Sequence, residues 1–324
     1  QASGFNPYLN PPHFAALVSP LAALPYILAL FIWIALGLLF FWFSIKWLGT
    51  EKPEKTALWA ITWFPVFAVV SFGQNSFFTL AVFCLTFFLW SRNRNWIAGL
   101  VFSLLLLKPQ FLTGIGFLWI MDWRRSWKSL LGLGMGILLQ IALNFLLLPE
   151  ASASYLEYTK TALPNLLHLE GFPIWNAFSV QSFWLSLMPG QPVIAAALYW
   201  ICLALGLFFF VRFWSKFRAH KPAAFLAAVL LTVWGVPYIM IYDWTLLLIP
   251  AILLWQSFPG QRETLKASFA VMWVAGLLSS VLAYLQAQTL PVVIQIAIPI
   301  FLWVNIHIYR TLKAERSQFQ LQND

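Results

Sequence analysis

The sequence predicts an all-α, polytopic transmembrane helical bundle, and three observations lead to this fold class. Apolar residues make up 61% of the 324 residues, and charged residues make up only 9%, against about 25% in an average soluble domain. The mean hydropathy is +0.80, with 31 Phe and 19 Trp. No soluble protein of this size could bury so much apolar surface, so its solvent must be lipid. A cytosolic enzyme, a DNA-binding domain and a disordered chain are thereby excluded.

Apolar runs bounded by charges, proline or glycine predict about eleven membrane segments, several of them short. The runs are continuous and lack the alternation that the strands of a membrane β-barrel need. In chain order, the segments are expected at 21–47, 57–72, 76–90, 96–107, 110–121, 129–148, 191–211, 222–240, 244–256, 267–286 and 291–309. Cys84 and Cys202 both lie inside such runs, so no disulfide scaffold is expected.

The basic residues predict the orientation of these segments. An N-terminus on the outer side places six connections on one face, at 48–56, 91–95, 122–128, 212–221, 257–266 and from 310 onward. With the adjoining helix ends, this face holds 17 of the 19 Lys and Arg, and only Lys108 and Lys160 fall on the other face. The positive-inside rule makes the basic face cytoplasmic. The net charge of +9 is therefore a topology signal, helped by attraction to anionic lipid, and predicts no nucleic-acid partner.

Residues 96–121 test this threading. One helix of about 39 Å, kinked at Pro109, would bury Lys108 near its middle and would reverse the orientation of everything downstream. Two half-length helices that meet at Lys108 and Pro109 preserve the charge rule. Each would rise only about 18 Å, short of a hydrocarbon core of about 30 Å. We therefore expect their outer ends to stop below the membrane surface, around a polar cavity.

The sequence predicts one integral membrane domain over residues 1–324, with a long outer-side loop at 149–190. Tyr155, Leu156 and Tyr158 indicate an amphipathic helix on the membrane surface, broken at Pro164. A loop of this length in a tight bundle is typical of a lid or binding loop. The chain opens at Gln1 without Met, and a Pro-rich stretch enters the first segment. We interpret it as an N-terminally truncated fragment whose first helix and first outer loop are missing.

Polar residues converge on the outer face in this threading. Three predicted hairpin tips carry them, and the long loop contributes more. They are Gln74 and Asn75, then Lys108, then Tyr242 and Asp243, with His168, Glu170, Trp175 and Asn176 from the loop. Amide, ammonium and carboxylate groups gathered at one level predict a buried polar site.

Each of these residues also has a simpler interpretation. Gln74 and Asn75 could cap a helix, Lys108 could snorkel or pair structurally with Asp243, and His168 could be an ordinary surface histidine. Gln140 and Asn144 are better explained by hydrogen bonds between helices than by ligand contacts. Asp243 and the three glutamates of the loop could form a divalent metal site, but their spacing gives no specific support. We expect no cofactor and assign no metal ligand.

The same motifs, in this order, resemble glycosyltransferase family 87 of the GT-C superfamily, formerly domain of unknown function 2029. The resemblance rests on Pro7-Tyr8-Leu9-Asn10-Pro11-Pro12-His13-Phe14, Gly73-Gln74-Asn75, Lys108-Pro109, Gly171-Phe172-Pro173-Ile174-Trp175-Asn176 and Tyr242-Asp243. It extends from about residue 7 to about residue 255. The family includes polyprenol-phosphate-mannose-dependent α-mannosyltransferases, so the resemblance implies a membrane glycosyltransferase with a GT-C bundle.

The resemblance implies transfer of a sugar, with mannose favoured, from a polyprenyl-phosphate carrier to a lipid or glycan acceptor. The reaction is expected on the outer, periplasmic face of a bacterial cytoplasmic membrane. Lys108 would bind the donor phosphate, and Trp175 could stack on a sugar ring. Gln74, Asn75 and Asn176 could hydrogen-bond hydroxyls or phosphate. Membrane lipids complete the expected partners.

An acceptor hydroxyl also needs a base. In GT-C enzymes this is an acidic residue of the first outer loop, which is expected upstream of Gln1, so Asp243 or Glu170 is only a fallback. Relatives often carry a His before the position of Asp243, but residues 236–241 contain none. Either His168 or Tyr238 could therefore be the residue that binds the phosphate together with Lys108. Because the first helix and outer loop are expected to be missing, the fragment could be inactive alone.

Two other function classes remain open at this stage. A transporter or lipid flippase would use an intramembrane pair of Lys108 and Asp243 for substrate or proton coupling. The absence of a visible inverted repeat counts against it. A non-catalytic scaffold subunit of a cell-envelope complex would use neither residue.

Overall fold

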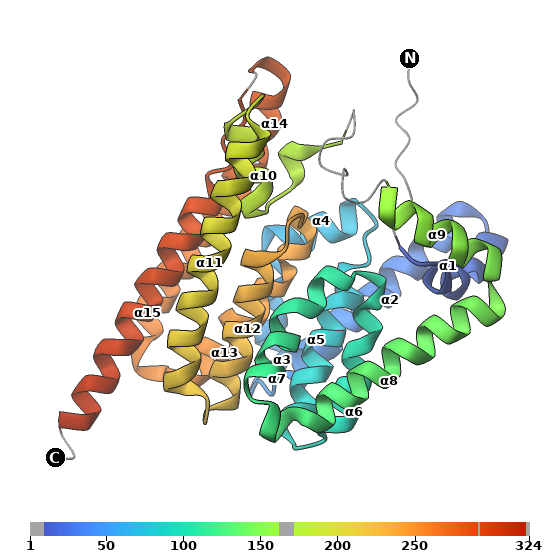
Figure 1. Ribbon diagram of the computed structural model, residues 1–324. Helices are drawn as coiled ribbons and strands as arrows, with labels where there is room; N and C mark the ends of the chain where they lie inside the picture. Colours follow the sequence, from blue (N-terminus) through green and yellow to red (C-terminus); the bar gives the residue numbers. More distant parts are fainter. Residues whose placement is uncertain (1–9, 162–171, 291, 322–324) are drawn as a thin grey trace. The chain divides into compact units, whose positions relative to one another are not determined.

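The computed structural model describes residues 10–161, 172–290 and 292–321 (Figure 1). These residues are mostly helical, as the sequence predicts, and among them the isolated antiparallel bridge between Ala177 and Met240 is the only strand-like pairing. Cys84 and Cys202 are free, as expected. The chain divides into two compact units. Unit 1 consists of residues 1–49 and 72–174, and unit 2 of residues 50–71 and 175–324.

Unit 1 is a bundle of long and half-length helices. Its elements are α1 (Pro12–Val18), η1 (Ser19–Ala23), α2 (Tyr26–Trp47), α5 (Ser76–Ser91), α6 (Asn95–Phe102), η2 (Ser103–Leu107), η3 (Pro109–Leu112), α7 (Thr113–Met121), α8 (Trp123–Leu147) and α9 (Pro149–Thr161). Helix α5 packs against α2 and α6, and α8 packs against α6, α7 and α9. The predicted surface helix of the long loop is confirmed as a helix, α9. Its position on a membrane stays a prediction, and Pro164 lies outside the described residues.

The predicted hairpin at Lys108 is present. The chain forms two helical stretches, Asn95–Leu107 and Pro109–Met121, on either side of Lys108. The stretches run antiparallel, because Phe102 of the first packs edge-on against Trp119 near the end of the second, with ring centroids 5.3 Å apart. Pro109 lacks an N–H and restricts the residue before it, which explains why no continuous helix forms. The single kinked helix is therefore wrong.

Unit 2 joins a short segment from the middle of the chain to its C-terminal half. Its elements are α3 (Pro53–Ile61), α4 (Phe64–Ser71), α10 (Val180–Leu187), α11 (Pro192–Phe217), α12 (Lys221–Gly235), η6 (Ile241–Leu247), α13 (Leu248–Ser257), η7 (Pro259–Gln261), α14 (Arg262–Thr289) and α15 (Ala297–Leu321), while η5 (Ile174–Asn176) lies at the boundary between the units. The short helix η6 contacts α4, α12 and α13, so it lies inside this unit.

Several predicted boundaries are corrected. The expected segment 57–72 is two short helices, α3 and α4. The break falls at Thr62 and Trp63, where Pro65 cannot supply the N–H that a continuing helix needs. Helix α12 ends at Gly235 rather than 240, because Pro237 holds Val236 in an extended conformation. The last segment begins at Ala297, six residues later than expected.

Four stretches of the described chain are long and apolar enough to cross a membrane. They are Tyr26–Trp47, Trp123–Leu147, Pro192–Phe217 and Pro259–Thr289. The other apolar helices are 10–17 residues long. A span count of about eleven and a single integral domain therefore stay predictions.

Candidate active site

The Gly73-Gln74-Asn75 turn of unit 1 is fixed by contacts across the bundle. Gly73 has a φ of +60°, a left-handed conformation that suits glycine, and its carbonyl accepts the indole N–H of Trp33 at 2.9 Å. Asn75 is the N-cap residue of α5, yet its side chain makes no cap hydrogen bond. Its Nδ2 instead donates to Oδ1 of Asn10 at 3.2 Å. Gln74 donates from Nε2 to the Phe72 carbonyl at 3.3 Å. The cap interpretation of the Asn75 side chain is therefore wrong.

A second amide anchors the same N-terminal turn. Nδ2 of Asn144, on α8, lies 2.7 Å from Nδ1 of His13, on α1. Burial lowers the pKa of His13, and the hydrogen bond to Asn144 partly opposes this shift. Asn144 thus bonds between helices, as predicted. So does Gln140, whose Nε2 donates to the carbonyl of Ser103 at 2.9 Å. The sequence predicted neither Asn10 nor His13 as a partner.

The two anchoring amides each keep an acceptor without a partner in the described chain. Asn75 and Asn144 are 7% and 8% exposed, and their Oδ1 atoms are buried without a hydrogen bond. An unsatisfied buried acceptor costs about 1–3 kcal/mol. Each oxygen can therefore accept a hydrogen bond from a hydroxyl group or a water molecule.

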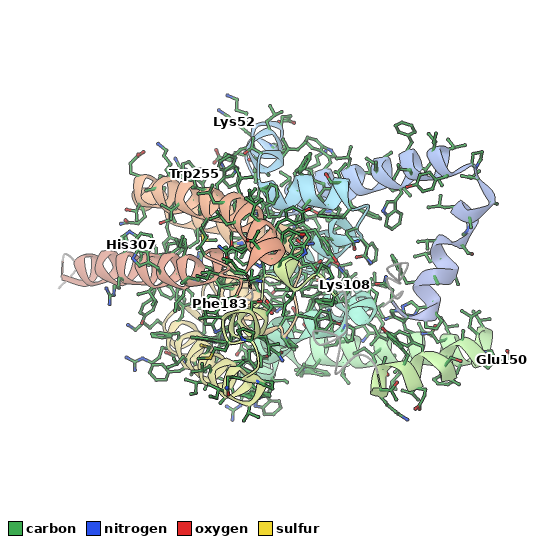
Figure 2. All side chains as sticks on the ribbon, turned by 90° about the horizontal axis from the view of Figure 1, so that it is seen from above. Lys52, Lys108, Glu150, Phe183, Trp255 and His307 are labelled. Carbon is green, nitrogen blue, oxygen red and sulfur yellow. The ribbon has the colours of Figure 1, made fainter. Side chains whose placement is uncertain are left out.

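Lys108 occupies the tip of the α6–α7 hairpin. It lies between η2 and η3, and its backbone is not helical, with φ −136° and ψ 72°. The side chain is half-buried, and Nζ lies 5.7 Å from the centre of the Phe111 ring. Figure 2 labels Lys108 well away from Glu150, which lies in the first turn of α9 in the same unit. Glu150 therefore does not belong to the surroundings of Lys108.

The predicted site residues of unit 2 lie around the turn before η6. Ala177 forms a bridge with Met240, and the amide of Phe178 donates to the carbonyl of Ile239 at 2.6 Å. Trp244 is fully buried, and its indole N–H donates to the carbonyl of Phe178 at 3.0 Å. Asp243, the residue before Trp244, is 5% exposed. This framework holds the loop around residue 177 beside the Tyr242-Asp243 turn.

Two predicted residues of the loop lie in this framework. Trp175 is half-buried and contacts Tyr284 edge-on, with ring centroids 5.0 Å apart. Asn176 ends the η5 turn and is 5% exposed. The structure thus brings Trp175, Asn176, Tyr242 and Asp243 into unit 2. Gln74, Asn75 and Lys108 lie in unit 1. A site shared by the two groups stays a prediction.

A buried polar clamp from the C-terminal segment holds the same loop, and sequence reasoning missed it. Nε2 of Gln295 donates to the carbonyl of Ala177 at 2.7 Å, and its Oε1 lies 3.4 Å from the Ser182 hydroxyl oxygen. The Ser182 hydroxyl also donates to that carbonyl, and the Ser179 hydroxyl donates to the carbonyl of Pro237 at 2.6 Å. All three side chains are fully buried. A lone Gln inside an apolar run was the available signal.

Other predicted site residues are not placed. His168 and Glu170 lie outside the described residues, so their roles stay predictions. Within the residues that are described, no group of three or more His, Cys, Asp or Glu could hold a metal ion.

Comparison with known proteins decides the family. The model of glycosyltransferase family 87 matches residues 8–250, which include segments of both units. The chain belongs to glycosyltransferase family 87. No curated protein and no solved structure matches the sequence. Together with its apolar helices, this membership identifies a multi-pass membrane glycosyltransferase with sugar donor and acceptor substrates.

Proposed function

We propose that this glycosyltransferase moves a sugar, with mannose favoured, from a polyprenyl-phosphate carrier to a lipid or glycan acceptor. The reaction takes place at the outer face of a bacterial cytoplasmic membrane. The observation that carries this proposal is the half-buried Lys108 at the junction of two half-length helices. A half-buried ammonium group beside apolar helices can form a charge-assisted hydrogen bond with a phosphate. A lipid-linked phosphate can meet it there, because its prenyl tail lies among apolar helices.

The proposed chemistry divides between the two groups of residues. An acceptor oxygen bonds to the anomeric carbon while the bond from that carbon to the phosphate oxygen breaks. Both electrons of the broken bond leave with the phosphate, and Lys108 stabilises the growing negative charge. The hydroxyl proton passes to an acidic residue, for which Asp243 is the described candidate. Glu170 is the other candidate.

Sugar recognition is assigned to amide and aromatic groups. Gln74, Asn75 and Asn176 hydrogen-bond hydroxyls or phosphate, and the unpartnered buried Oδ1 of Asn75 supports this role. Trp175 stacks on the sugar ring. His168 and Tyr238 are the proposed partners of Lys108 at the phosphate, and Tyr242 adds a hydroxyl. The reaction as proposed needs no cofactor.

The test uses the protein in liposomes with labelled polyprenyl-phosphate-mannose and a membrane glycolipid extract. We expect label transfer by the wild type and a loss of at least about 100-fold in Lys108→Ala, the scale of removing one strong transition-state contact. Lys108→Arg keeps the charge and should retain partial activity. Lys160→Ala is the matched control, because Lys160 is the other lysine of the predicted outer face.

Transfer that survives in Lys108→Ala would overturn the phosphate-binding role and leave the carrier class intact. Failure with mannose would require the same assay with other polyprenyl-phosphate sugars. Failure with every such carrier would contradict the proposed donor class.

A further inference from the structure

An exposed basic patch lies at one end of unit 1, away from the Lys108 tip. Two connections supply it, one before α6 and one at the start of α8. Its cations are Arg92, Arg94, Arg124, Arg125 and Lys128, all of them exposed. Trp96, Trp123 and Trp127 are 40%, 60% and 48% exposed beside them. We call these eight residues the Arg/Trp patch.

Helix packing brings the two connections together. Nδ2 of Asn95 donates to the carbonyl of Arg125 at 3.3 Å. Farther along, Gly99 faces Ser129, and Ser103 meets Gly136 and Gln140, so α6 and α8 run parallel from this end. Figure 1 shows the two helices side by side. Both helix starts, with their basic residues, therefore lie at the same end of the unit.

The connection before α6 has a fixed conformation. Asn93 has a φ of 61°, its amide donates to the carbonyl of Trp90, and the amide of Arg94 donates to the carbonyl of Leu89. These two bonds are the Schellman arrangement that ends a helix in a defined geometry. Arg92 lies over the Phe88 ring at 3.6 Å, which orients its guanidinium. The arginines thus project from a rigid turn.

Charge balance distinguishes the Arg/Trp patch from the basic connections at residues 50–56 and near residue 262, whereas residues 212–221 likewise carry four cations and no acid. At residues 50–56, Lys52 and Lys55 alternate with Glu51 and Glu54, and near residue 262 Lys266 pairs with Glu263. The patch has five cations and only the half-buried Asp122. Orientation in the membrane requires positive charge alone, which lysine supplies as well as arginine. It does not require a concentration of arginine and exposed tryptophan at adjoining turns.

Arginine and tryptophan together match one class of ligand. Guanidinium groups bind phosphate in a two-pronged geometry, and indole rings lie at the level of lipid headgroups. Neither α6 nor α8 has a side-chain cap, so first-turn N–H groups of both helices also face this end. We propose that the Arg/Trp patch binds the headgroup of an anionic phospholipid, with the acyl chains against the adjoining apolar helix faces. The proposal holds for either orientation in the membrane and is independent of the sugar donor.

The test measures binding of phosphatidylglycerol to the full chain in non-ionic detergent, by native mass spectrometry and by the shift in thermal unfolding midpoint. Phosphatidylcholine is the neutral reference lipid. In the test variant, Arg92, Arg94, Arg124 and Arg125 are each changed to Gln. The matched control changes four exposed cations elsewhere, Lys46, Lys52, Lys55 and Arg218, to Gln, so the change in net charge is equal.

We expect the test variant to bind phosphatidylglycerol at least about tenfold more weakly, since each basic residue near anionic lipid contributes several-fold. The control should bind as the wild type does, and a variant with four Arg→Lys changes should be intermediate. Equal binding by wild type and test variant, or equal loss in the control, would overturn the proposal. The shared chemistry is a phosphate group, so inorganic phosphate and glycerophosphoglycerol are added as competitors. Displacement of the lipid by millimolar inorganic phosphate would overturn the assignment to a lipid.

Discussion

His220 caps helix α12 through a ring nitrogen, so the protonation state of one residue controls the start of a helix. Its Nδ1 accepts the amide N–H of Ala223 at 3.2 Å, which requires that nitrogen to be unprotonated. Partial burial lowers the pKa of His220. Because the folded state disfavours the charged ring, this stabilisation is fully present above about pH 6.5, the unfolded pKa. It is lost as the pH falls below that value.

We therefore expect the thermal unfolding midpoint of the wild type to fall more steeply below about pH 6.5 than that of His220→Asn. Asparagine caps a helix without titrating. Midpoints measured in nanodiscs from pH 8 to pH 5 provide the comparison. His13 is present in both proteins, so its own lowered pKa cancels in the difference. Parallel pH profiles of the two unfolding midpoints would show that protonation of the His220 ring does not affect the cap of α12.

The contact between α6 and α8 depends on glycine at the scale of whole elements. A Cβ atom on Gly132 would lie 2.1 Å from the carbonyl oxygen of Trp96, and one on Gly99 would lie 1.9 Å from that of Ser129. Both obstacles are backbone atoms, so a side-chain rotation cannot relieve them. The two helices would have to separate.

Gly132→Ala is expected to destabilise unit 1 by about 1–3 kcal/mol or more, the cost of overpacking. Gly134→Ala, on the same helix, has open space around its Cβ and should be neutral or stabilise the helix by about 0.5–1 kcal/mol. Denaturant midpoints of the two variants, at matched detergent concentration, would test the difference. A stable Gly132→Ala would mean that α6 and α8 can move apart at little cost.

The clamp at Gln295 gives a second prediction at this scale. Gln295→Leu removes a buried donor to the carbonyl of Ala177, at an expected cost of about 1–3 kcal/mol. Amide hydrogen exchange should accelerate at Phe178, which bonds across to Ile239. Gln256→Leu, an exposed change on α13, is the control and should alter neither quantity. Unchanged amide exchange at Phe178 would show that Gln295 does not hold this loop in place.

Hydrophobic runs and charges predicted most of the helices but not their partners. The hairpin at Lys108 followed from Pro109 and the charge rule. The break at Trp63 was missed although Pro65 signals it, and the hydrogen bond from the Trp63 indole to the carbonyl of Trp244, distant in the chain, could not be predicted at all. The pairing of Asn10 with Asn75 is similar, since composition indicates that an amide needs a partner without indicating which one. The polar site residues could thus be proposed from the sequence, but the contacts that position them could not.

The whole molecule distributes its candidate chemistry over both units. The family match, residues 8–250, includes the tips with Lys108 and Asn75 in unit 1 and the Asp243 turn in unit 2. Segment 50–71 belongs to unit 2 although residues before and after it belong to unit 1, so the chain passes between the units more than once. Exchange of one unit between relatives would therefore require three junctions, at residues 49/50, 71/72 and 174/175.

The orientation of the whole chain is the last prediction. Single cysteines in a background without Cys84 and Cys202 would be labelled with a membrane-impermeant maleimide in inside-out and right-side-out vesicles. Basic residues surround three of the chosen positions, so these should react from the cytoplasmic side: Glu51→Cys, Arg94→Cys and Ser215→Cys. The other two, Ser71→Cys and Gln191→Cys, should react from the outer side. All five positions are exposed in the structure. Reaction of Arg94→Cys and Ser215→Cys from opposite sides would require an odd number of crossings between them. That result would contradict the threading that places the Lys108 hairpin on the outer face.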